Sequence, residues 1–166
     1  EEIDSAVKFK LGFPMGIFEL ADFTGMDVIH KATVEMYLRD KKVINPHKTI
    51  EKMFDEKKLG QKSGEGYYKY SDDKYERVEL SEELAQKCNP IQLVANVLNN
   101  AAWLITNGAS DVEEIEKAAK LGLGLRKPLF ETAKEIGIQN IVDELNNLTR
   151  EYGEFYRPDP LLETMI

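Results

Sequence analysis

The chain has 166 residues, of which 42% are hydrophobic and 31% charged, and its net charge at pH 7 is −8. This composition is typical of a globular protein with room for a sizeable core, and the negative charge argues against a nucleic-acid partner, because phosphate binding needs a basic surface. No apolar run reaches the length of a membrane span, and the single cysteine, Cys88, excludes an internal disulfide framework and favours a cytoplasmic location.

The first elements are two helices joined by a rigid turn. An apolar stripe at helical spacing ends at Gly12, and residues 12–16 then contain two glycines and Pro14, which force an irregular backbone. Phe13 and Met15 project from this turn, which is either a packing corner or the wall of an apolar pocket. A short helix then runs to Gly25.

Two more helices and an extended segment complete the first half. One helix follows Gly25, and another is predicted to start at Asn45 and Pro46, with Asn45 as the N-cap, and to end at Gly60. The glycine-rich loop 60–66 leads into alternating aromatic residues, so we expect a short extended segment near 66–80, with 75–80 pairing back as a weak hairpin. This segment is also the best candidate linker.

The second half is predicted to be helical throughout. A short helix begins at Ser81, and a long apolar helix runs from Pro90 to Thr106. An apolar stripe over 138–152 predicts another long helix, and the tail 155–166 is expected to be irregular with a last helical turn. The predicted fold class is therefore all-α.

An internal repeat relates the two halves. Residues 1–29 align with 113–141 without a gap, at a constant offset of 112, and 12 of the 29 positions are identical. We therefore predict two copies of one helical domain, at 1–80 and 81–166. The helix over 90–106 has no partner in the first copy, and the chain starts at Glu1 within a helical pattern, so we expect a fragment of a longer protein.

The histidines offer no convincing metal or hydrolytic site. Asp27 and His30 lie one helical turn apart, but two ligands without a third do not make a metal site. His47, next to Pro46, is expected to be exposed. Neither histidine has a nearby nucleophile with an orienting group.

Two other patterns favour structural roles. The loop 60–66 matches neither the dinucleotide-binding nor the P-loop pattern, so turn chemistry is the better interpretation. Glu19, Asp22 and Asp27 could supply an acid/base pair, although a solvated helix face is the more common arrangement. The residues alone thus indicate a duplicated helical domain with one distinctive turn.

Two motifs carry a family resemblance. Residues 11–27 and 59–70 resemble the two hallmarks of the C-terminal domain of 3-hydroxyacyl-CoA dehydrogenases, and they stand at the expected separation. The stretch from about Pro90 to Ile166 resembles the degenerate second C-terminal domain of the longer members, including those fused to an enoyl-CoA hydratase. Ile17 stands where the family commonly has proline, a mild departure from the motif.

The resemblance implies that different domains carry out catalysis and bind the acyl end of the substrate. Such enzymes couple an N-terminal Rossmann domain, which binds NAD and carries a catalytic His–Glu pair, to a helical domain, and acyl-CoA lies between the two. All of those catalytic positions would precede Glu1, so no catalytic, cofactor-binding or metal residue is expected in this chain. By resemblance, Phe13, Pro14 and Met15 would bind substrate at the acyl end of the cleft.

The resulting prediction is a part of an NAD-dependent 3-hydroxyacyl-CoA dehydrogenase of fatty acid metabolism. Its partners would be the Rossmann domain of the same protein, the acyl-CoA substrate and a second copy in a homodimer, and the second helical copy would pack on the first as an internal pseudo-dimer. The fragment alone is expected to be inactive and to bind no NAD; whether a hydratase domain follows Ile166 is left open. The alternative is a freestanding helical acyl-CoA-binding or interaction module.

Overall fold

A computed structural model describes residues 1–39, 47–71, 74–75 and 79–165. The regular structure in these residues is helical apart from one small hairpin, so the all-α prediction is confirmed. In chain order the elements are α1 (Glu2–Phe9), α2 (Ile17–Thr24), α3 (Met26–Arg39), α4 (Lys48–Asp55), η1 (Gln61–Ser63), β1 (Tyr70–Ser71), β2 (Lys74–Tyr75), α5 (Glu82–Gln86), α6 (Ile91–Thr106), α7 (Val112–Gly122), α8 (Leu129–Ile136), α9 (Ile138–Tyr152), η2 (Glu154–Tyr156) and α10 (Pro160–Thr164).

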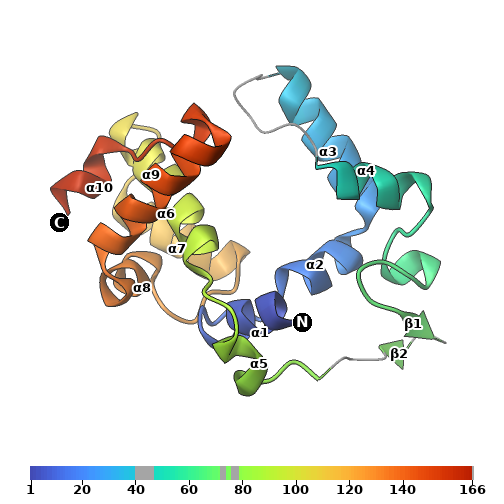
Figure 1. The fold of residues 1–166 in the computed structure, drawn as a ribbon. Helices are drawn as coiled ribbons and strands as arrows, with labels where there is room; N and C mark the ends of the chain where they lie inside the picture. Colours follow the sequence, from blue (N-terminus) through green and yellow to red (C-terminus); the bar gives the residue numbers. More distant parts are fainter. Residues whose placement is uncertain (40–46, 72–73, 76–78, 166) are drawn as a thin grey trace.

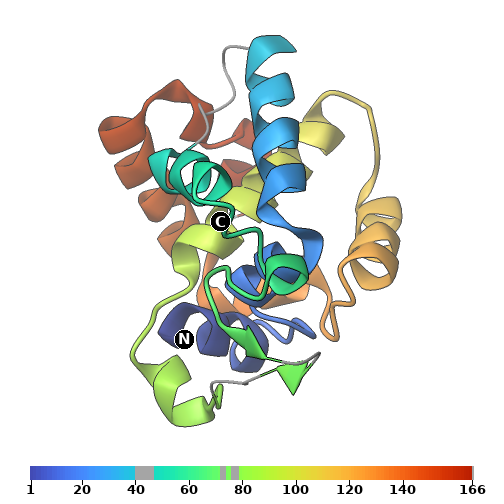
Figure 2. The same cartoon turned by 90° about the vertical axis from the view of Figure 1, so that its right-hand side faces the viewer.

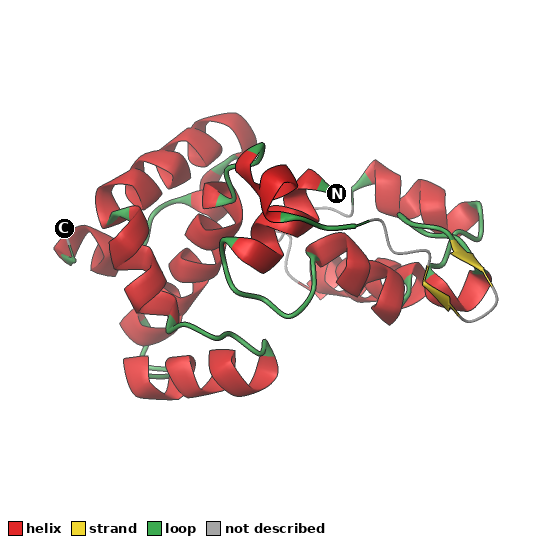
Figure 3. Cartoon of the chain, turned by 90° about the horizontal axis from the view of Figure 1, so that it is seen from below, coloured by secondary structure: helices red, strands yellow, loops and turns green. Residues whose placement is uncertain are grey.

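The helices form two groups that α1 and α5 join (Figure 1). Helices α6 to α10 gather on one side, and α2 to α4 lie with the hairpin on the other. Helices α1 and α5 pack against each other between these groups, as the view from below also shows (Figure 3). Below, residues 1–80 are called the N-terminal half and residues 81–166 the C-terminal half.

The hydrophobic core lies mainly in the C-terminal half. Helices α6 and α9 pack together there, and Leu98, Ile141 and Leu145 are fully buried between the helices of this group. Val7 and Leu11 extend the same core from the N-terminal half. The apolar stripe of α1 therefore faces the C-terminal helices and ties the two halves together.

The hairpin falls where an extended segment is predicted. Strands β1 and β2 are antiparallel, with Tyr70 opposite Tyr75 and Ser71 opposite Lys74. The returning strand thus begins one residue before the predicted stretch 75–80, of which residues 76–78 lie outside the described part of the chain.

Helix α4 begins later than predicted. Asn45 and Pro46 lie outside the described residues, and the N-cap is His47, whose Nδ1 accepts a hydrogen bond of 3.2 Å from the Thr49 backbone N–H. An exposed imidazole nitrogen can satisfy a free N–H of the first turn as an Asn oxygen would. The prediction of Asn45 as the N-cap was therefore wrong, while the expected exposure of His47 is confirmed.

The offset of 112 residues persists well beyond the aligned sequence. Helices α2 and α8 have identical bounds at this offset, α3 and α9 both begin after a glycine of positive φ, and α4 and α10 begin 112 residues apart. Their N-caps correspond as well, since Asp159 accepts from the Leu161 N–H as His47 does from Thr49. The long helix α6 has no counterpart in the described residues of the N-terminal half (Figure 2).

Truncating Leu145 tests this account of the core. Leu145 is fully buried in the middle of α9, so Leu145→Ala is expected to lower the free energy of unfolding by about 2–5 kcal/mol in urea denaturation. Leu121→Ala is the control, because that side chain is 74% exposed and should change the stability by less than about 0.5 kcal/mol. Equal effects of the two changes would contradict the placement of the core.

Candidate functional site

The distinctive turn is anchored by Asp4, a carboxylate buried in α1. Its two oxygens accept hydrogen bonds from the backbone N–H groups of Phe18, at 2.8 Å, and Glu19, at 3.0 Å, in the first turn of α2. A helix N-terminus presents unpaired N–H groups and a partial positive charge, so it stabilises this anion. Asp4 thereby fixes where α2 starts and how residues 12–16 must run to reach it.

The same carboxylate requires glycine at the end of the turn. A Cβ on Gly16 would lie 2.2 Å from the Asp4 carboxyl carbon, so a larger residue cannot occupy that position without displacing Asp4. Glu19 closes the turn from the other side, since its Oε2 accepts the Gly16 N–H at 2.9 Å. Both acids are buried.

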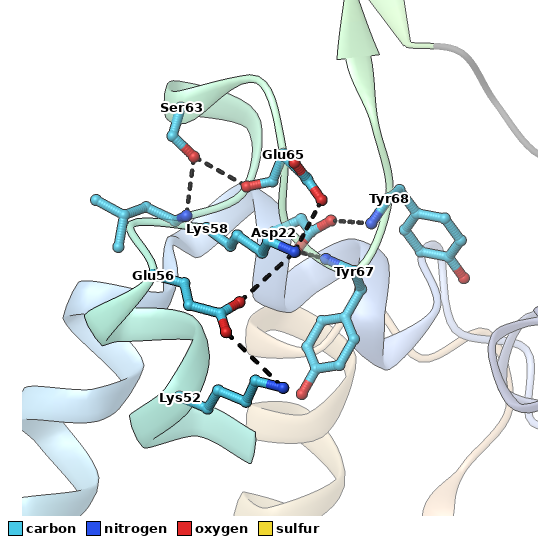
Figure 4. A network of polar contacts seen from close by, with 9 residues as sticks. Asp22, Lys52, Glu56, Lys58, Ser63, Glu65, Tyr67 and Tyr68 are labelled. Atoms are coloured by element: carbon cyan, nitrogen blue, oxygen red, sulfur yellow. Dashed lines mark hydrogen bonds and ion pairs between the residues drawn. The ribbon is translucent and has the colours of Figure 1, made fainter. Parts of the chain in front are cut away.

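A second buried carboxylate, Asp22, joins the two sequence motifs. Its Oδ1 accepts the Tyr67 N–H at 2.8 Å, and its Oδ2 accepts the Tyr68 N–H at 2.9 Å and the Tyr70 hydroxyl at 2.8 Å. Figure 4 shows Asp22 on α2 reaching into the loop that carries Tyr67 and Tyr68. The motif at 11–27 and the motif at 59–70 are therefore two sides of one hydrogen-bonded unit.

Close packing around Asp22 explains the glycines of the second motif. A Cβ on Gly66 would lie 2.1 Å from Asp22 Oδ1, and one on Gly60 would lie 2.3 Å from the Asp22 carbonyl oxygen. The loop must approach α2 at backbone distance to donate its N–H groups, and only glycine permits that approach.

Tyr68 links the two carboxylates. Its backbone N–H binds Asp22, and its hydroxyl donates to Asp4 Oδ2 at 2.7 Å. Burial of the phenol, its hydrogen bond to Asp4 and the negative charge there all raise the pKa of Tyr68 far above its usual range. Burial and the Asp22 charge raise the pKa of Tyr67 as well.

The glycine-rich loop uses its own backbone donors. The Gly60 N–H binds the Glu65 carbonyl, the Gly64 N–H binds the Gln61 carbonyl and the Gly66 N–H binds the Tyr68 carbonyl. The Ser63 hydroxyl accepts the Leu59 N–H at 2.8 Å. With these groups already paired, the loop has the structure of a closed turn and not of an open phosphate cradle.

Ion pairs on the outer surface of this loop add little stability. Lys58 lies 3.2 Å from Glu65 and 3.6 Å from Glu56, and these carboxylates raise its pKa (Figure 4). The groups are well exposed, so the surrounding water screens the attraction between their charges. Lys62 pairs with Asp27, and this contact lowers the pKa of the Asp27 carboxyl.

His30 occupies an interhelical position and does not face a metal ligand set. Its ring stacks on Phe54 of α4, with 4.3 Å between ring centroids and 6° between ring planes. Within the described ranges, no group of three or more His, Cys, Asp or Glu side chains is arranged to hold a metal ion. Glu19 and Asp22 accept hydrogen bonds from backbone N–H groups, so these acids, considered as an acid/base pair from the sequence, have a structural role.

The three residues expected to bind substrate differ in their exposure and in whether they line a cavity. Phe13 is half-buried and packs against the edge of the core, while Pro14 is exposed and Met15 is half-buried. A cavity of about 490 Å³ lies between the two halves, and Phe13 lines it but Pro14 and Met15 do not. Pro14 instead contacts the equivalent turn of the C-terminal half, since a Cβ on Gly124 would lie 3.2 Å from its Cγ.

The sequence analysis did not single out Asp4, Tyr68 or Tyr70. A signal for Asp4 was available, because it falls on the buried face of its helix together with Val7 and Leu11. An acid on an apolar stripe must find partners on burial. The repeat also places Glu116 at the position equivalent to Asp4, and its two oxygens accept the N–H groups of Leu129, at 2.7 Å, and Phe130, at 2.8 Å.

Comparison with known proteins identifies the family. The family model for the 3-hydroxyacyl-CoA dehydrogenase C-terminal domain matches residues 1–70 and 92–166, which is most of the chain. The chain belongs to this family. The resemblance inferred from the two motifs is thereby confirmed.

Solved structures share the fold of the chain over nearly its full length. One is 3-hydroxybutyryl-CoA dehydrogenase from Escherichia coli, with a TM-score of 0.76 and 20% identity over 99% of this chain and 53% of the other. Another is the dehydrogenase part of multifunctional enzyme 1 from C. elegans, with a TM-score of 0.65 and 22% identity over 98% of this chain and 41% of the other.

Sequence relatives are longer proteins. The mitochondrial hydroxyacyl-coenzyme A dehydrogenase of Rattus norvegicus is 39% identical over 72 residues, which span 42% of this chain and 23% of that protein. The fatty acid oxidation complex subunit alpha of Idiomarina loihiensis is 26% identical over the whole chain and 25% of its own length. The chain thus spans about a quarter of the length of these relatives. No helix within its described residues is long and apolar enough to cross a membrane.

Neutralising Asp22 tests the unit that joins the motifs. Asp22→Asn places an amide group against N–H donors, so the unfolding free energy should fall by about 2–4 kcal/mol in urea denaturation. Asp143→Asn on α9 is the matched control, because Asp143 is exposed and its side chain binds only Gln139 among the contacts described. Similar stabilities of the two variants would show that the Asp22 contacts contribute little.

The Tyr68 hydroxyl predicts a loss of stability in alkali. A pKa raised in the folded state means that the contribution of this phenol is complete below the ordinary tyrosine pKa of about 10 and is lost as the pH rises above it. Tyr68→Phe should lower the stability at pH 8 and make the decline above pH 10 shallower, measured by urea denaturation across that range. A decline as steep as that of the wild type would exclude Tyr68 as its source.

Proposed function

We propose that the chain is the helical, substrate-facing part of an NAD-dependent 3-hydroxyacyl-CoA dehydrogenase of fatty acid metabolism. The observation that carries the proposal is the meeting of both family motifs at Asp22, which holds the loop 59–70 against the helix that follows the turn. Together with Asp4 it sets the positions of Phe13, Pro14 and Met15, which would form the acyl end of the cleft. The single Cys88 is consistent with a cytoplasmic enzyme.

We also propose that the two halves are tandem copies, 1–80 and 81–166, packed as an internal pseudo-dimer. The contacts between their turns are reciprocal: Gly12 lies against Arg126, and Pro14, equivalent to Arg126, lies against Gly124, equivalent to Gly12. Reciprocal contacts of this kind characterise two-fold interfaces. The pairing within one chain would provide the surface that a homodimer provides in shorter enzymes, and a homodimer of the whole protein would be a further level of assembly.

A difference between the halves indicates which one faces the partner domain. Exposed apolar side chains of α2 and α3 in the N-terminal half stand at positions where the C-terminal half has polar residues: Leu20, Phe23 and Val28 correspond to Thr132, Glu135 and Asn140. Exposed apolar groups of this kind favour an interface. This asymmetry supports docking of the Rossmann domain and acyl-CoA on the N-terminal half.

NAD is proposed to bind outside the described residues. A dinucleotide phosphate needs unpaired N–H groups at a helix N-terminus. Here α2 and α8 already hold carboxylates at that place, from Asp4 and Glu116, and the N–H groups of Gly60, Gly64 and Gly66 are bound within their loop. NAD and the catalytic His–Glu pair would therefore belong to the Rossmann domain, and this helical part would position the acyl chain and exclude water.

Activity measurements test the proposal. The isolated chain should not reduce NAD with 3-hydroxybutyryl-CoA, whereas the natural full-length protein should, with NADH absorbance as the measure. In the full-length enzyme, Phe13→Ala should lower kcat/KM at least tenfold when measured well below the Tm of the variant, because it removes a wall of the acyl site. Leu121→Ala, exposed on α7, is the control.

Other results would decide against the proposal. NAD reduction by the isolated chain would refute its dependence on another domain, and a full-length protein without dehydrogenase activity would refute the enzyme assignment. The alternative, a freestanding acyl-CoA-binding module, would be favoured by tight acyl-CoA binding in a natural protein that has no NAD domain.

A further inference from the structure

Six apolar residues of the N-terminal half are more exposed than their equivalents in the C-terminal half. At the offset of 112, each corresponds to a buried apolar residue. The contrast is largest at Met36, which is 54% exposed, whereas its equivalent Leu148 is 6% exposed. The six residues, called the open face below, are Ile17, Phe18, Ala21, Ile29, Met36 and Ile50, on α2, α3 and α4.

Helix α6 covers the equivalent positions in the C-terminal half. It packs against α8, α9 and α10, and its Ala95, Leu98 and Ala102 are fully buried. Helices α2, α3 and α4 are the equivalents of α8, α9 and α10, yet among the described residues no counterpart of α6 packs on them. An apolar face of this kind, which its own counterpart keeps buried, indicates an interaction surface.

The open face differs from the apolar side chains proposed above to meet the Rossmann domain, because those correspond to polar residues. Helix α3 shows the distinction between two of its own exposed side chains. Met36 corresponds to the buried Leu148, whereas Leu38, which is 60% exposed, corresponds to the exposed Arg150. A cover equivalent to α6 would therefore bury Met36 and leave Leu38 in contact with solvent.

The cavity between the two halves is consistent with the same interpretation. Phe13 and Ile17 line it from one half, and their equivalents Leu125 and Leu129 line it from the other. Helix α6 lines it as well, but among the described residues no equivalent helix of the N-terminal half does so. A two-fold arrangement would place such a helix against Leu125 and Leu129, where it would narrow or close the cavity.

We propose that the open face binds an apolar-striped helix of the natural full-length protein, equivalent to α6 and located just before Glu1 in the sequence. This inference rests on the proposed function only in taking the chain as part of a longer protein. Glu1 corresponds to Glu113, and α6 begins 22 and ends 7 residues before Glu113. The offset therefore places the helix 22 to 7 residues before Glu1.

The connection in the C-terminal half favours a helix of the same polypeptide over a second copy of the protein. Residues 107–111 join α6 directly to α7, which is the equivalent of α1. A helix tethered by a connection this short meets its surface at a high effective concentration, which a separate molecule in solution does not reach.

Photo-cross-linking in the natural full-length protein identifies what covers the open face. Photo-methionine has nearly the size of methionine and, at Met36, links to whatever lies against that side chain. Mass spectrometry should find Met36 linked to a peptide 22 to 7 residues before Glu1. Mixing isotope-labelled and unlabelled protein should show that the link lies within one chain. A link only to another segment or to a second copy, or no link from Met36, would overturn the proposal, as would a natural protein without residues before Glu1.

Paired charge substitutions on α3 test the cover independently. In the full-length protein, Met36→Asp should speed amide exchange across residues 26–39 at least about tenfold, because it would put a carboxylate beneath the covering helix. Leu38→Asp is the matched control and should leave this exchange nearly unchanged. In the isolated 166-residue chain the two variants should behave alike, since both side chains are exposed. Equal exchange of the two variants in the full-length protein would contradict the cover.

Neither experiment uses NAD, acyl-CoA or activity. A covering helix can therefore be found in a protein without dehydrogenase activity, which would refute the proposed function alone. An active dehydrogenase whose Met36 links elsewhere would refute this inference alone.

Discussion

The N-terminal half depends on two carboxylates that are buried without a cationic partner. Asp4 is completely buried and Asp22 is 1% exposed, yet every described contact of their oxygens is with a backbone N–H or a tyrosine hydroxyl. A buried charge is tolerated only when such donors surround it, so the donors must be held in place. The turn, the start of α2 and the glycine-rich loop are all fixed by this requirement. The two motifs that identify the family are therefore the parts of the chain that these carboxylates need.

The C-terminal half is stabilised mainly by different contacts. It keeps the first anchor, with Glu116 in place of Asp4, but has Lys134 where the N-terminal half has Asp22. Its stability comes from the apolar core around α6 and α9, which the N-terminal half lacks among its described residues. One half thus preserves a polar, shape-determining turn, and the other provides a hydrophobic platform against which Val7 and Leu11 pack. The cavity at their seam combines residues of both.

Local signals in the sequence were enough to predict most of the helices, but they predicted little of the candidate site. The glycines at 25, 137 and 153 bound helices that periodicity also indicated, so the helical order was predictable. The repeat was recognisable from the sequence only as far as Ile29, because the two halves have few identical residues beyond it. In the structure the offset of 112 continues to α4 and α10, whose N-caps are residues of different types, His47 and Asp159. Asp22 was visible as a candidate acid, but its role depends on a loop 45 residues away, which no local pattern specifies.

The central claim is that the anchored turn of the N-terminal half faces the acyl-CoA substrate. Amide hydrogen exchange of the natural full-length protein, with and without bound 3-hydroxyacyl-CoA, tests it most directly. The account predicts slower exchange on ligand binding across residues 11–20, and a smaller change across the equivalent residues 123–132. Unchanged exchange across 11–20, with protection only at other parts of the protein, would contradict it.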